Sequence, residues 1–288
     1  MEALAIKNSS IVVDATLGSS GHAAHIVSLL GKKGTFVGID ADPDAISLGN
    51  DTLVNHKCHL HLSPGNFRNI DSILDLLHIE KVDAILADLG WRMEQFSGNG
   101  RGFSFQIDEP LIMTYGAPDA YAFNAADVVN EWKEEDIKNV LKAYGEERFS
   151  GRIARHIVEA RKVKPILTTF DLVLVVMDAV PAFYKRGKIH PATRTFQALR
   201  IVVNDEFDAL DEFIKKAVGR LTVGGRLAII SFHSTEDRIV KHLFKTLAHD
   251  HVGIMHTKKP IAATREEIVT NPRSRSAKLR IFEKNAET

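Results

Sequence analysis

The sequence predicts an α/β protein whose parallel sheet is interrupted by an all-helical insertion. Between residues 10 and 90, short apolar runs rich in Val and Ile alternate with helix-like segments, which is typical of βαβ units around a parallel sheet. After Gly90 the pattern becomes mostly helical, and strand-like runs return only beyond about residue 205. We therefore expect a sheet domain that is discontinuous in the chain and a helical domain within it.

The first part of the chain supplies alternating elements. The strands are expected at 10–16, 34–40, 58–63 and 82–90, and the helices between them at 21–30, 43–55 and 67–78. Pro43 follows Asp42 where the second helix would begin, and proline suits this position because the N–H that it lacks would be unpaired there.

The middle of the chain predicts four helices. They are expected at 134–145, 146–162, 168–180 and 191–203. Gly145 would cap the first of them, Pro165 and Pro181 would follow the ends of the next two, and Pro191 would open the last.

The last part of the chain completes the sheet domain. Residues 224–232 read as a buried strand, 234–248 as a helix, and 277–284 as a final edge strand. The predicted domains are therefore 1–102 with 205–288, and the inserted 103–204.

Composition narrows the function classes. Lys and Arg together number 37, as do Asp and Glu, so any nucleic-acid surface must be local. A single cysteine, Cys58, excludes an intramolecular disulfide. No leader-like opening is recognised, and no apolar run approaches the roughly 18 residues that span a bilayer. We expect a cytoplasmic protein without membrane insertion.

The stretch "DATLGSSGH" follows the first strand, where open parallel sheets bind ligands. A dinucleotide fold would need G-x-G-x-x-G so that the backbone could approach a pyrophosphate. Only Gly18 and Gly21 are present, which argues against NAD and FAD. S-adenosylmethionine fits better, since it presents an amino-acid carboxylate and a ribose in place of phosphates.

Three acids end successive strands in this part of the chain. Asp14, Asp40 and Asp88 occupy these positions. Asp40 could accept both ribose hydroxyls, and Asp88 would lie near the adenine or the reacting centre. Each acid taken alone could equally be a helix cap or turn residue. The histidines and acids show no metal-ligand spacing, so no metal is expected.

The stretch "DLGW" places an acid three residues before an aromatic, as in N4-cytosine and N6-adenine methyltransferases. The lone pair of an exocyclic amine is delocalised into the ring. Asp88 or a neighbouring carbonyl would therefore hold the N–H while Trp91 packs on the base. A tryptophan that packs in the core or between domains is an equal alternative for Trp91.

Several longer stretches carry a resemblance over nearly the whole chain. They are "DATLGSSGH", "GIDADPDAI", "DLGWRMEQF", "GRGFSF", "LKAYGEERFSGRIARHIVEAR", "HPATRTFQALRIVVNDEF", "GGRLAIISFHSTEDRIVK" and "NPRSRSAKLR". The chain resembles the bacterial rRNA small-subunit methyltransferase H family, which methylates N4 of a cytidine in the decoding region of 16S rRNA. The resemblance implies a class I, Rossmann-like, S-adenosylmethionine-dependent methyltransferase domain with a helical insertion.

The resemblance also implies a set of functional residues. The cofactor contacts would be Ser20, Gly21, His22, Asp40, Phe67, Asp88 and Gln95, beside the turn residue Gly18, and the catalytic pair would be Asp88 and Trp91. Phe67 would stack on adenine or, alternatively, pack in the core. His22 would reach the cofactor carboxylate or, alternatively, cap a helix.

The helical insertion carries a candidate track for RNA phosphates. Arg148, Arg152 and Arg155 have the i, i+4, i+7 spacing of one helix face, and basic residues at 161–164 extend it. Salt bridges with neighbouring glutamates are an alternative. Thr193, Gln197 and Arg200 share another helix face and suggest a lined cleft.

Two further RNA contacts are expected near the C-terminus. His233, after the strand 224–232, would contact the target nucleotide or order its loop. A capping role is an alternative, with Ser234 as N-cap and Asp237 three residues on. Arg273 and Arg275 would contact the RNA backbone.

The chain departs from the family pattern at Ser19 and Ser20, since the family turn is commonly richer in glycine, and at two stretches that bear on catalysis. Trp91-Arg92-Met93 stands where many members have Val-Ser-Ser, and "PLIMTY" stands where many have Pro-Leu-Asp-Met-Arg-Met. Neither Arg92 nor Ile112 can replace an acid or a serine in catalysis. The expected substrate is small-subunit rRNA in an assembled or assembling subunit, and a homo-oligomer stays open. A ribosome-binding relative with impaired catalysis, or a methyltransferase for another nucleic acid, stays open as an alternative.

Overall fold

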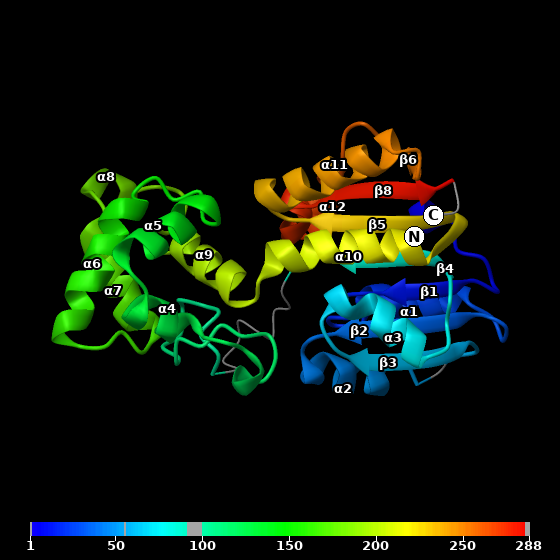
Figure 1. The fold of residues 1–288 in the computed structure, drawn as a ribbon, viewed down its shortest axis with the longest axis horizontal. Coiled ribbons are helices and arrows are strands. Elements are labelled where there is room, and N and C mark those ends of the chain that lie inside the picture. Colours follow the sequence, from blue (N-terminus) through cyan, green and yellow to red (C-terminus); the bar gives the residue numbers. More distant parts are fainter. Residues whose placement is uncertain (1, 55, 91–99, 286–288) are drawn as a thin grey trace. The chain divides into compact units, whose positions relative to one another are not determined.

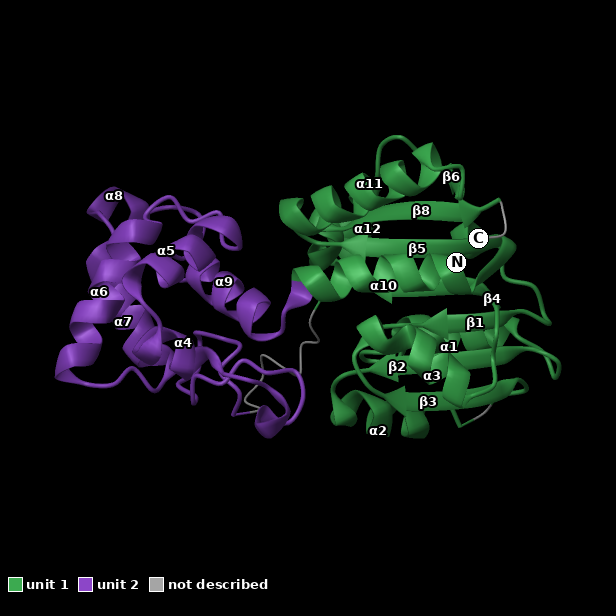
Figure 2. Ribbon diagram, viewed as in Figure 1, with its two compact units in different colours: residues 1–91, 207–288 green, residues 92–206 purple. Residues whose placement is uncertain are grey.

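A computed structural model describes residues 2–54, 56–90 and 100–285. The chain forms two compact units (Figure 2). The first, here called the sheet unit, comprises Met1–Trp91 and Phe207–Thr288, and the second, the helical unit, comprises Arg92–Glu206. Each is described by itself. No described helix is both long and apolar enough to cross a membrane.

The sheet unit is built on one mixed sheet with the strand order β3-β2-β1-β4-β5-β8-β6, and β7 pairs with β8 (Figure 1). The strands are β1 Ile11–Asp14, β2 Thr35–Asp40, β3 His59–Pro64, β4 Val82–Asp88, β5 Leu221–Ser231, β6 Gly253–Met255, β7 Ile261–Ala262 and β8 Lys278–Lys284. The first five are mutually parallel, whereas β8 runs antiparallel to β5 and β6.

Helices lie on both faces of this sheet (Figure 1). The helices of the sheet unit are α1 Gly21–Leu29, α2 Pro43–Thr52, α3 Ile70–Leu76, α10 Glu206–Arg220, α11 Ser234–His249 and α12 Arg265–Thr270. Alternate strand residues feed two cores: Val13 packs in the core formed with α3, α10 and α11, and Val12 in the core formed with α1. This period of two explains why the strands read as almost continuous apolar runs.

Two features of the sheet unit differ from the sequence prediction. β8 is not an edge strand, because β6 and β7 pair with it on the side away from β5. Helix α10, which the sequence analysis did not predict, buries Leu210, Phe213, Ile214 and Ala217. Their spacing of three and four residues is a helical signal that was present in the sequence.

The helical unit has its own core, formed by helices that the insertion supplies. They are α4 Ala125–Glu131, α5 Glu134–Ala143, α6 Ser150–Val163, α7 Thr169–Ala179, α8 Ala182–Lys185 and α9 Thr193–Val203. Thr168 caps α7 by accepting a hydrogen bond from the Asp171 N–H. Buried side chains on α5, α6, α7 and α9 meet in one cluster, so these amphipathic helices stabilise one another.

The connection between α5 and α6 corrects two expectations. Helix α6 begins at Ser150 rather than near residue 146, because Glu146 has a φ of 49° and Glu147 accepts a hydrogen bond from the Phe149 N–H. Tyr144 is the C-cap of α5. Gly145 is needed for packing instead, since an added Cβ would lie 2.5 Å from the Arg194 carbonyl oxygen.

Candidate cofactor site and RNA-binding surface

The carboxyl ends of β1, β2 and β4 bring the three strand-terminal acids to one edge of the sheet. Asp14 is in register with Gly38 of β2 and Leu86 of β4. Because the strands are parallel and adjacent, the ends of all three lie on the same side. Asp14, Asp40 and Asp88 are thereby gathered at the start of α1.

The turn that leads from β1 into α1 is held by Asp40. One carboxylate oxygen of Asp40 accepts from the Gly18 N–H at 2.9 Å, and the other accepts from the Asp42 N–H at 2.9 Å. Gly18 and Ser20 have φ values of 53° and 62°. This left-handed conformation strains Ser20, and the strained turn sets the direction in which α1 starts.

The first turn of α1 is open. Ser20 is the N-cap residue, but its side chain makes no capping hydrogen bond. A Cβ added to Gly21 would meet no atom within 4 Å. The first N–H groups of a helix lack partners within the helix, so this end of α1 can receive an anionic group of a ligand.

His22 and Asp88 form the second part of the edge. His22 Nε2 lies 3.4 Å from Asp88 Oδ2, and the two side chains are 45% and 31% exposed. The hydrogen bond to Asp88 raises the pKa of His22 while burial opposes the increase, and the charges of Asp88 and Asp14 add to it. The Asp88 N–H donates to Thr16 Oγ1 at 2.7 Å, which fixes the end of β4 against the β1 turn.

Asp14 lies beneath this pair and is only 1% exposed. Its Oδ1 accepts from the Thr16 N–H at 3.2 Å, but its buried Oδ2 has no hydrogen-bond partner among the described residues. Burial raises the pKa of Asp14 to about 7; the Thr16 hydrogen bond and His22 lower it, and the charges of Asp88 and Asp40 raise it further. Asp14 is therefore partly protonated at neutral pH.

Two further oxygens near this edge are also buried without a described hydrogen-bond partner. Ser20 Oγ and Asp88 Oδ1 are buried without a hydrogen-bond partner in the part of the chain that the structure describes. Buried polar atoms are normally satisfied, and each exception needs a reason. The unpartnered acceptors at the ends of β1 and β4 fit a ligand that supplies hydrogen-bond donors, whereas Ser20 Oγ lies on the side of α2, 3.4 Å from a Cβ added to Gly49.

Phe67 follows β3 in a short 3-10 helix, Phe67–Asn69. Its half-buried ring packs edge-on against Phe213, with ring centroids 5.0 Å apart. The Gly65 N–H donates to the Asp40 carbonyl oxygen at 2.8 Å, which ties this loop to the end of β2. Trp91 and Gln95 lie outside the described residues.

The basic residues of the helical unit are only partly arranged as expected. Arg152 and Arg155 are exposed on α6, but Arg148 precedes the helix and lies over the Phe149 ring at 6.0 Å. The expectation that all three share a helix face is therefore wrong. Arg155 lies 3.7 Å from Glu134.

The other basic residues near the end of α6 have partners in the unit. Arg161 donates to the Val129 carbonyl oxygen at 2.8 Å, whereas Lys162 and Lys164 pair with acids. Lys162 pairs with Glu159, as the salt-bridge alternative expects, and Lys164 pairs with Asp171.

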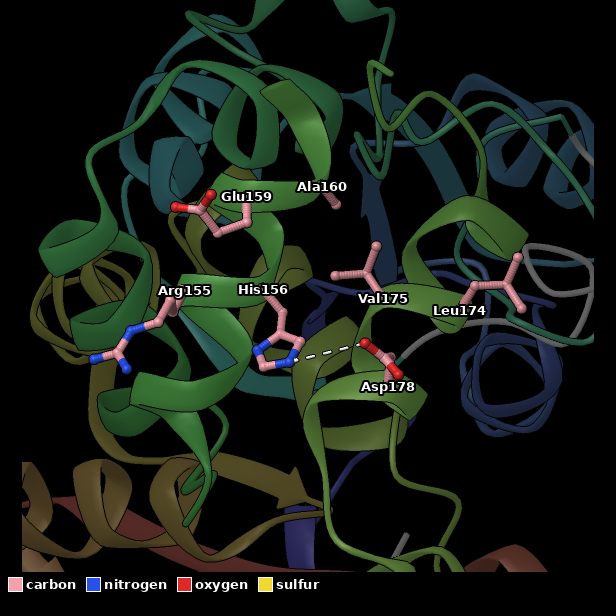
Figure 3. A pocket seen from close by; sticks show the side chains of 7 residues that line it. All are labelled: Arg155, His156, Glu159, Ala160, Leu174, Val175 and Asp178. Carbon is pink, nitrogen blue, oxygen red and sulfur yellow. Dashed lines mark ion pairs between the residues drawn. The ribbon is translucent and has the colours of Figure 1, made fainter. Parts of the chain in front are cut away.

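A shallow hollow of about 490 Å³ lies between α6 and α7 (Figure 3). Arg155, His156 and Glu159 line it from α6, and Asp178 lines it from α7, where it lies 3.8 Å from His156 Nε2. His156 Nδ1 also lies 2.8 Å from the Arg152 carbonyl oxygen. Acidic and basic groups are mixed here, so the hollow favours no ligand of one charge.

Arg200 is placed differently from what the sequence analysis expects. It is 5% exposed, and its Nε and one terminal nitrogen donate to the two carboxylate oxygens of Glu206 at 2.7 and 2.8 Å. Gln197, on the same helix, donates to the Tyr144 carbonyl oxygen at 3.4 Å. Arg200 thus stabilises the helical unit from within and presents almost no surface.

His233, rather than Ser234, is the N-cap of α11. Its Nδ1 accepts from the Glu236 N–H, and Glu236 Oε2 accepts from the His233 N–H. Asp237 instead pairs with the buried Arg280 at 2.6 Å. Arg273 and Arg275 are exposed in the segment Pro272–Ser276.

The fold and the edge together define a class of protein. The sheet has a parallel part with helices on both faces, a turn after β1 with only two glycines, and acids at the ends of β1, β2 and β4. These features are typical of an enzyme that binds a nucleoside-containing cofactor without a pyrophosphate. No described group of three or more His, Cys, Asp or Glu residues is arranged to hold a metal ion.

Comparison with known proteins specifies the family. The model of the MraW methylase family matches residues 1–285. "Ribosomal RNA small subunit methyltransferase H" of Clostridioides difficile (strain 630) is 42% identical over 99% of this chain and 96% of its own length. The proteins of the same name from Clostridium botulinum (strain Loch Maree / Type A3) and Brevibacillus brevis are 44% and 40% identical over 99% of this chain, and over 96% and 95% of their own lengths.

The chain belongs to the MraW methylase family, which confirms the resemblance found in the sequence. It is an S-adenosylmethionine-dependent methyltransferase, and the residues at the edge fit this cofactor. The open start of α1 suits a carboxylate, and the buried Oδ2 of Asp14 suits an ammonium group. The two Asp40 oxygens accept from the Gly18 and Asp42 N–H groups, and a carboxylate at the end of β2 suits a ribose hydroxyl.

Proposed function

We propose that this chain methylates the N4 amine of a cytidine in the decoding region of small-subunit rRNA. The observation that carries the proposal is the match, over almost the whole length of both chains, to relatives named ribosomal RNA small subunit methyltransferase H. The carboxyl edge supports it, because the acid that ends β4 beside the expected cofactor position has an oxygen without a partner among the described residues.

The residues at the carboxyl edge would contribute to catalysis mainly by holding the amine and the methyl group in the geometry for transfer. The cofactor supplies an electrophilic methyl group, and the N4 nitrogen, once methylated, must lose one proton. Asp88 Oδ2 faces His22, so Asp88 Oδ1 is the oxygen available to orient the N4–H bond and accept that proton. A fixed geometry of this kind lowers the entropic cost of transfer. Trp91 would pack on the base.

Cofactor binding would use the same edge. We assign Gly18, Ser20, Gly21 and His22 to the amino-acid end of the cofactor and Asp40 to its ribose. Phe67 would present to adenine the part of its ring that Phe213 leaves uncovered, and Gln95 would complete the contacts.

RNA binding would use exposed basic residues. We assign phosphate contacts to Arg148, Arg152 and Arg155 in the proposed recognition domain, residues 103–204, and to Arg273 and Arg275 near the C-terminus. Their exposure supports this assignment. Arg200 and His233 are left out, since buried ion pairing and helix capping already occupy them. The partner would be an assembled or assembling small ribosomal subunit in the cytoplasm.

The test is labelled methyl transfer to small ribosomal subunits that lack the modification, followed by nucleoside digestion and mass spectrometry. N4-methylcytidine that disappears in Asp88→Ala supports the proposal. Label on a different nucleoside overturns the proposed acceptor but keeps the enzyme class. Cofactor binding and subunit binding without label would show that the departures at Arg92 and Ile112 have removed the activity.

A further inference from the structure

The carboxyl edge holds a buried acid that the proposed reaction does not use. Asp14 is 1% exposed, and its Oδ2 has no hydrogen-bond partner among the described residues. Asp14 Oδ2 is thus a buried acceptor without a described donor, and an ammonium group has three N–H bonds to donate.

The charges that face Asp14 come from three elements. His22 approaches from α1, Asp88 from β4 and Asp40 from β2. His22 is already paired with Asp88, so its positive charge only partly offsets two carboxylates beside Asp14. A buried carboxyl group in this setting holds its proton more tightly than an exposed one, and a cation brought next to it favours the ionised form.

We propose that Asp14 gives up a proton when S-adenosylmethionine binds, so that the ionised Asp14 receives the ammonium group of the cofactor. The proton goes to solvent, and no bond other than the O–H bond of Asp14 is broken. Asp14 is thus a cofactor-binding residue whose protonation competes with the ligand. The inference rests on the cofactor part of the proposed function and is independent of the RNA substrate.

The pH dependence of cofactor binding follows from this competition. The pKa of about 7 for Asp14 in the unliganded protein means that protons compete below neutral pH and not above about pH 8. The dissociation constant for S-adenosylmethionine should therefore rise about tenfold between pH 8 and pH 6. His22 would take up a proton on cofactor binding where Asp14 releases one, because a cofactor carboxylate beside His22 favours its protonated form.

Isothermal titration calorimetry measures the proton directly. The unmodified chain is titrated with S-adenosylmethionine at one pH in buffers of different ionisation enthalpy, and the dependence of the heat on that enthalpy counts the protons. Asp14 should contribute release of about half a proton at pH 7, close to one at pH 6 and almost none at pH 8.5. Proton uptake by His22 subtracts from this number in the unmodified chain, so the count is also made in His22→Gln. Heat that is independent of the buffer at pH 6 and pH 7 in both the unmodified chain and His22→Gln overturns the inference.

Matched variants and ligands identify the group that releases the proton. Asp14→Asn should abolish the release and flatten the pH dependence, whereas His22→Gln should preserve the release. With the unmodified chain, S-adenosylhomocysteine, which keeps the ammonium group, should release the proton, and methylthioadenosine, which lacks it, should not. Equal release with both ligands, or release that persists in Asp14→Asn, overturns the inference.

Failure of the inference and failure of the proposed function give different results. Cofactor binding without proton release, together with N4-methylcytidine formation, overturns only the role of Asp14. Proton release that depends on Asp14, in a protein that transfers no methyl group to the subunit, supports this inference and overturns the proposed function.

Discussion

The carboxyl edge of the sheet and the exposed face of α6 use charge in opposite ways. At the edge, Asp14 is buried and short of hydrogen-bond partners. On and beside α6, Arg155, Lys162 and Lys164 are exposed and lie near acids. Buried, unsatisfied groups cost stability, and exposed pairs contribute little. The proposed cofactor site at the edge thus lowers the stability of the ligand-free protein, whereas the exposed pairs on and beside α6 change the stability little.

The largest expected effect is at Asp88. Asp88→Ala removes the group proposed to hold the N4–H bond, and we expect the rate of methyl transfer to fall about 1000-fold, or about 4 kcal/mol in activation free energy. The measurement is single-turnover transfer of labelled methyl to small subunits. Asp75→Ala, an exposed acid on α3, is the matched control. More than a tenth of the original rate in Asp88→Ala would assign the role to another group.

The second effect is the loss of stability when a buried arginine is removed, compared with the loss for a more exposed arginine. Arg200→Ala leaves the partly buried Glu206 carboxylate with the Tyr115 hydroxyl but without its cation, so the free energy of unfolding should fall by about 3 kcal/mol. Arg194→Ala, a less buried arginine on the same helix, should cost under about 1 kcal/mol. Urea unfolding measures both.

The same pair of variants tests the role of Arg200 in RNA binding. The salt dependence of subunit binding should be unchanged in folded Arg200→Ala, because the residue presents almost no surface. A shallower salt dependence would restore Arg200 to the RNA-binding surface.

The third effect is the change in the free energy of unfolding with pH, which has opposite signs for Asp14 in the sheet unit and Asp171 in the helical unit. The folded-state pKa of Asp14 is raised from 3.8 to about 7, so the stability that its protonated form provides is lost as pH rises between these values. At pH 8 the ionised group costs up to about 4 kcal/mol. Asp14→Asn should raise the free energy of unfolding of the ligand-free protein at pH 8 by about 2 kcal/mol, since the amide still lacks partners.

Asp171 provides the contrasting case in the helical unit. Burial acts to raise its pKa, but hydrogen bonds and the charge of Lys164 lower it overall. Its contribution is therefore present above its unfolded pKa and is lost in acid. Asp171→Asn should lower the free energy of unfolding at pH 7 by under about 1 kcal/mol. Urea unfolding at pH 5, 7 and 8 checks both variants, and a stability gain in Asp171→Asn or a loss in Asp14→Asn at pH 8 would contradict the comparison.

Much of the fold was predictable because it depends on local periodicity. The runs that became β1, β2 and β4 are apolar on both faces, as a sheet between two helical layers requires. The edge assignment of β8 was wrong, because the pairing of β6 and β7 with it is non-local. The start of α6 was missed since it depends on the side chain of Glu147 and not on hydrophobic pattern.

The sequence was enough to predict which acids lie at the site, but not how deeply each is buried or which partners it has. Asp14, Asp40 and Asp88 stand at strand ends, and parallel pairing brings such ends together. The sequence carries no sign that Oδ2 of Asp14 would be buried without a partner among the described residues, or that Arg200 would be buried and paired with Glu206. Both depend on packing between elements distant in the chain.

The smallest expected effect concerns the exposed face of α6. Arg152→Gln combined with Arg155→Gln removes two proposed phosphate contacts, so subunit affinity at about 0.1 M salt should fall about tenfold. Each lost contact should also reduce the slope of log affinity against log salt by about 1. Binding to small subunits across a KCl series measures both quantities, and cofactor affinity should stay unchanged.

Lys215→Gln on α10 is the control, because Lys215 is an equally exposed cation of the sheet unit that pairs with Asp211. If the control weakened subunit binding as much as the double variant, the effect would reflect total charge and not a track on α6. A loss confined to the double variant would show that exposed, loosely paired arginines hold the RNA while the buried acids of the sheet hold the cofactor. The difference in burial and pairing between the two regions would then correspond to a difference in ligand, RNA for α6 and the cofactor for the sheet edge.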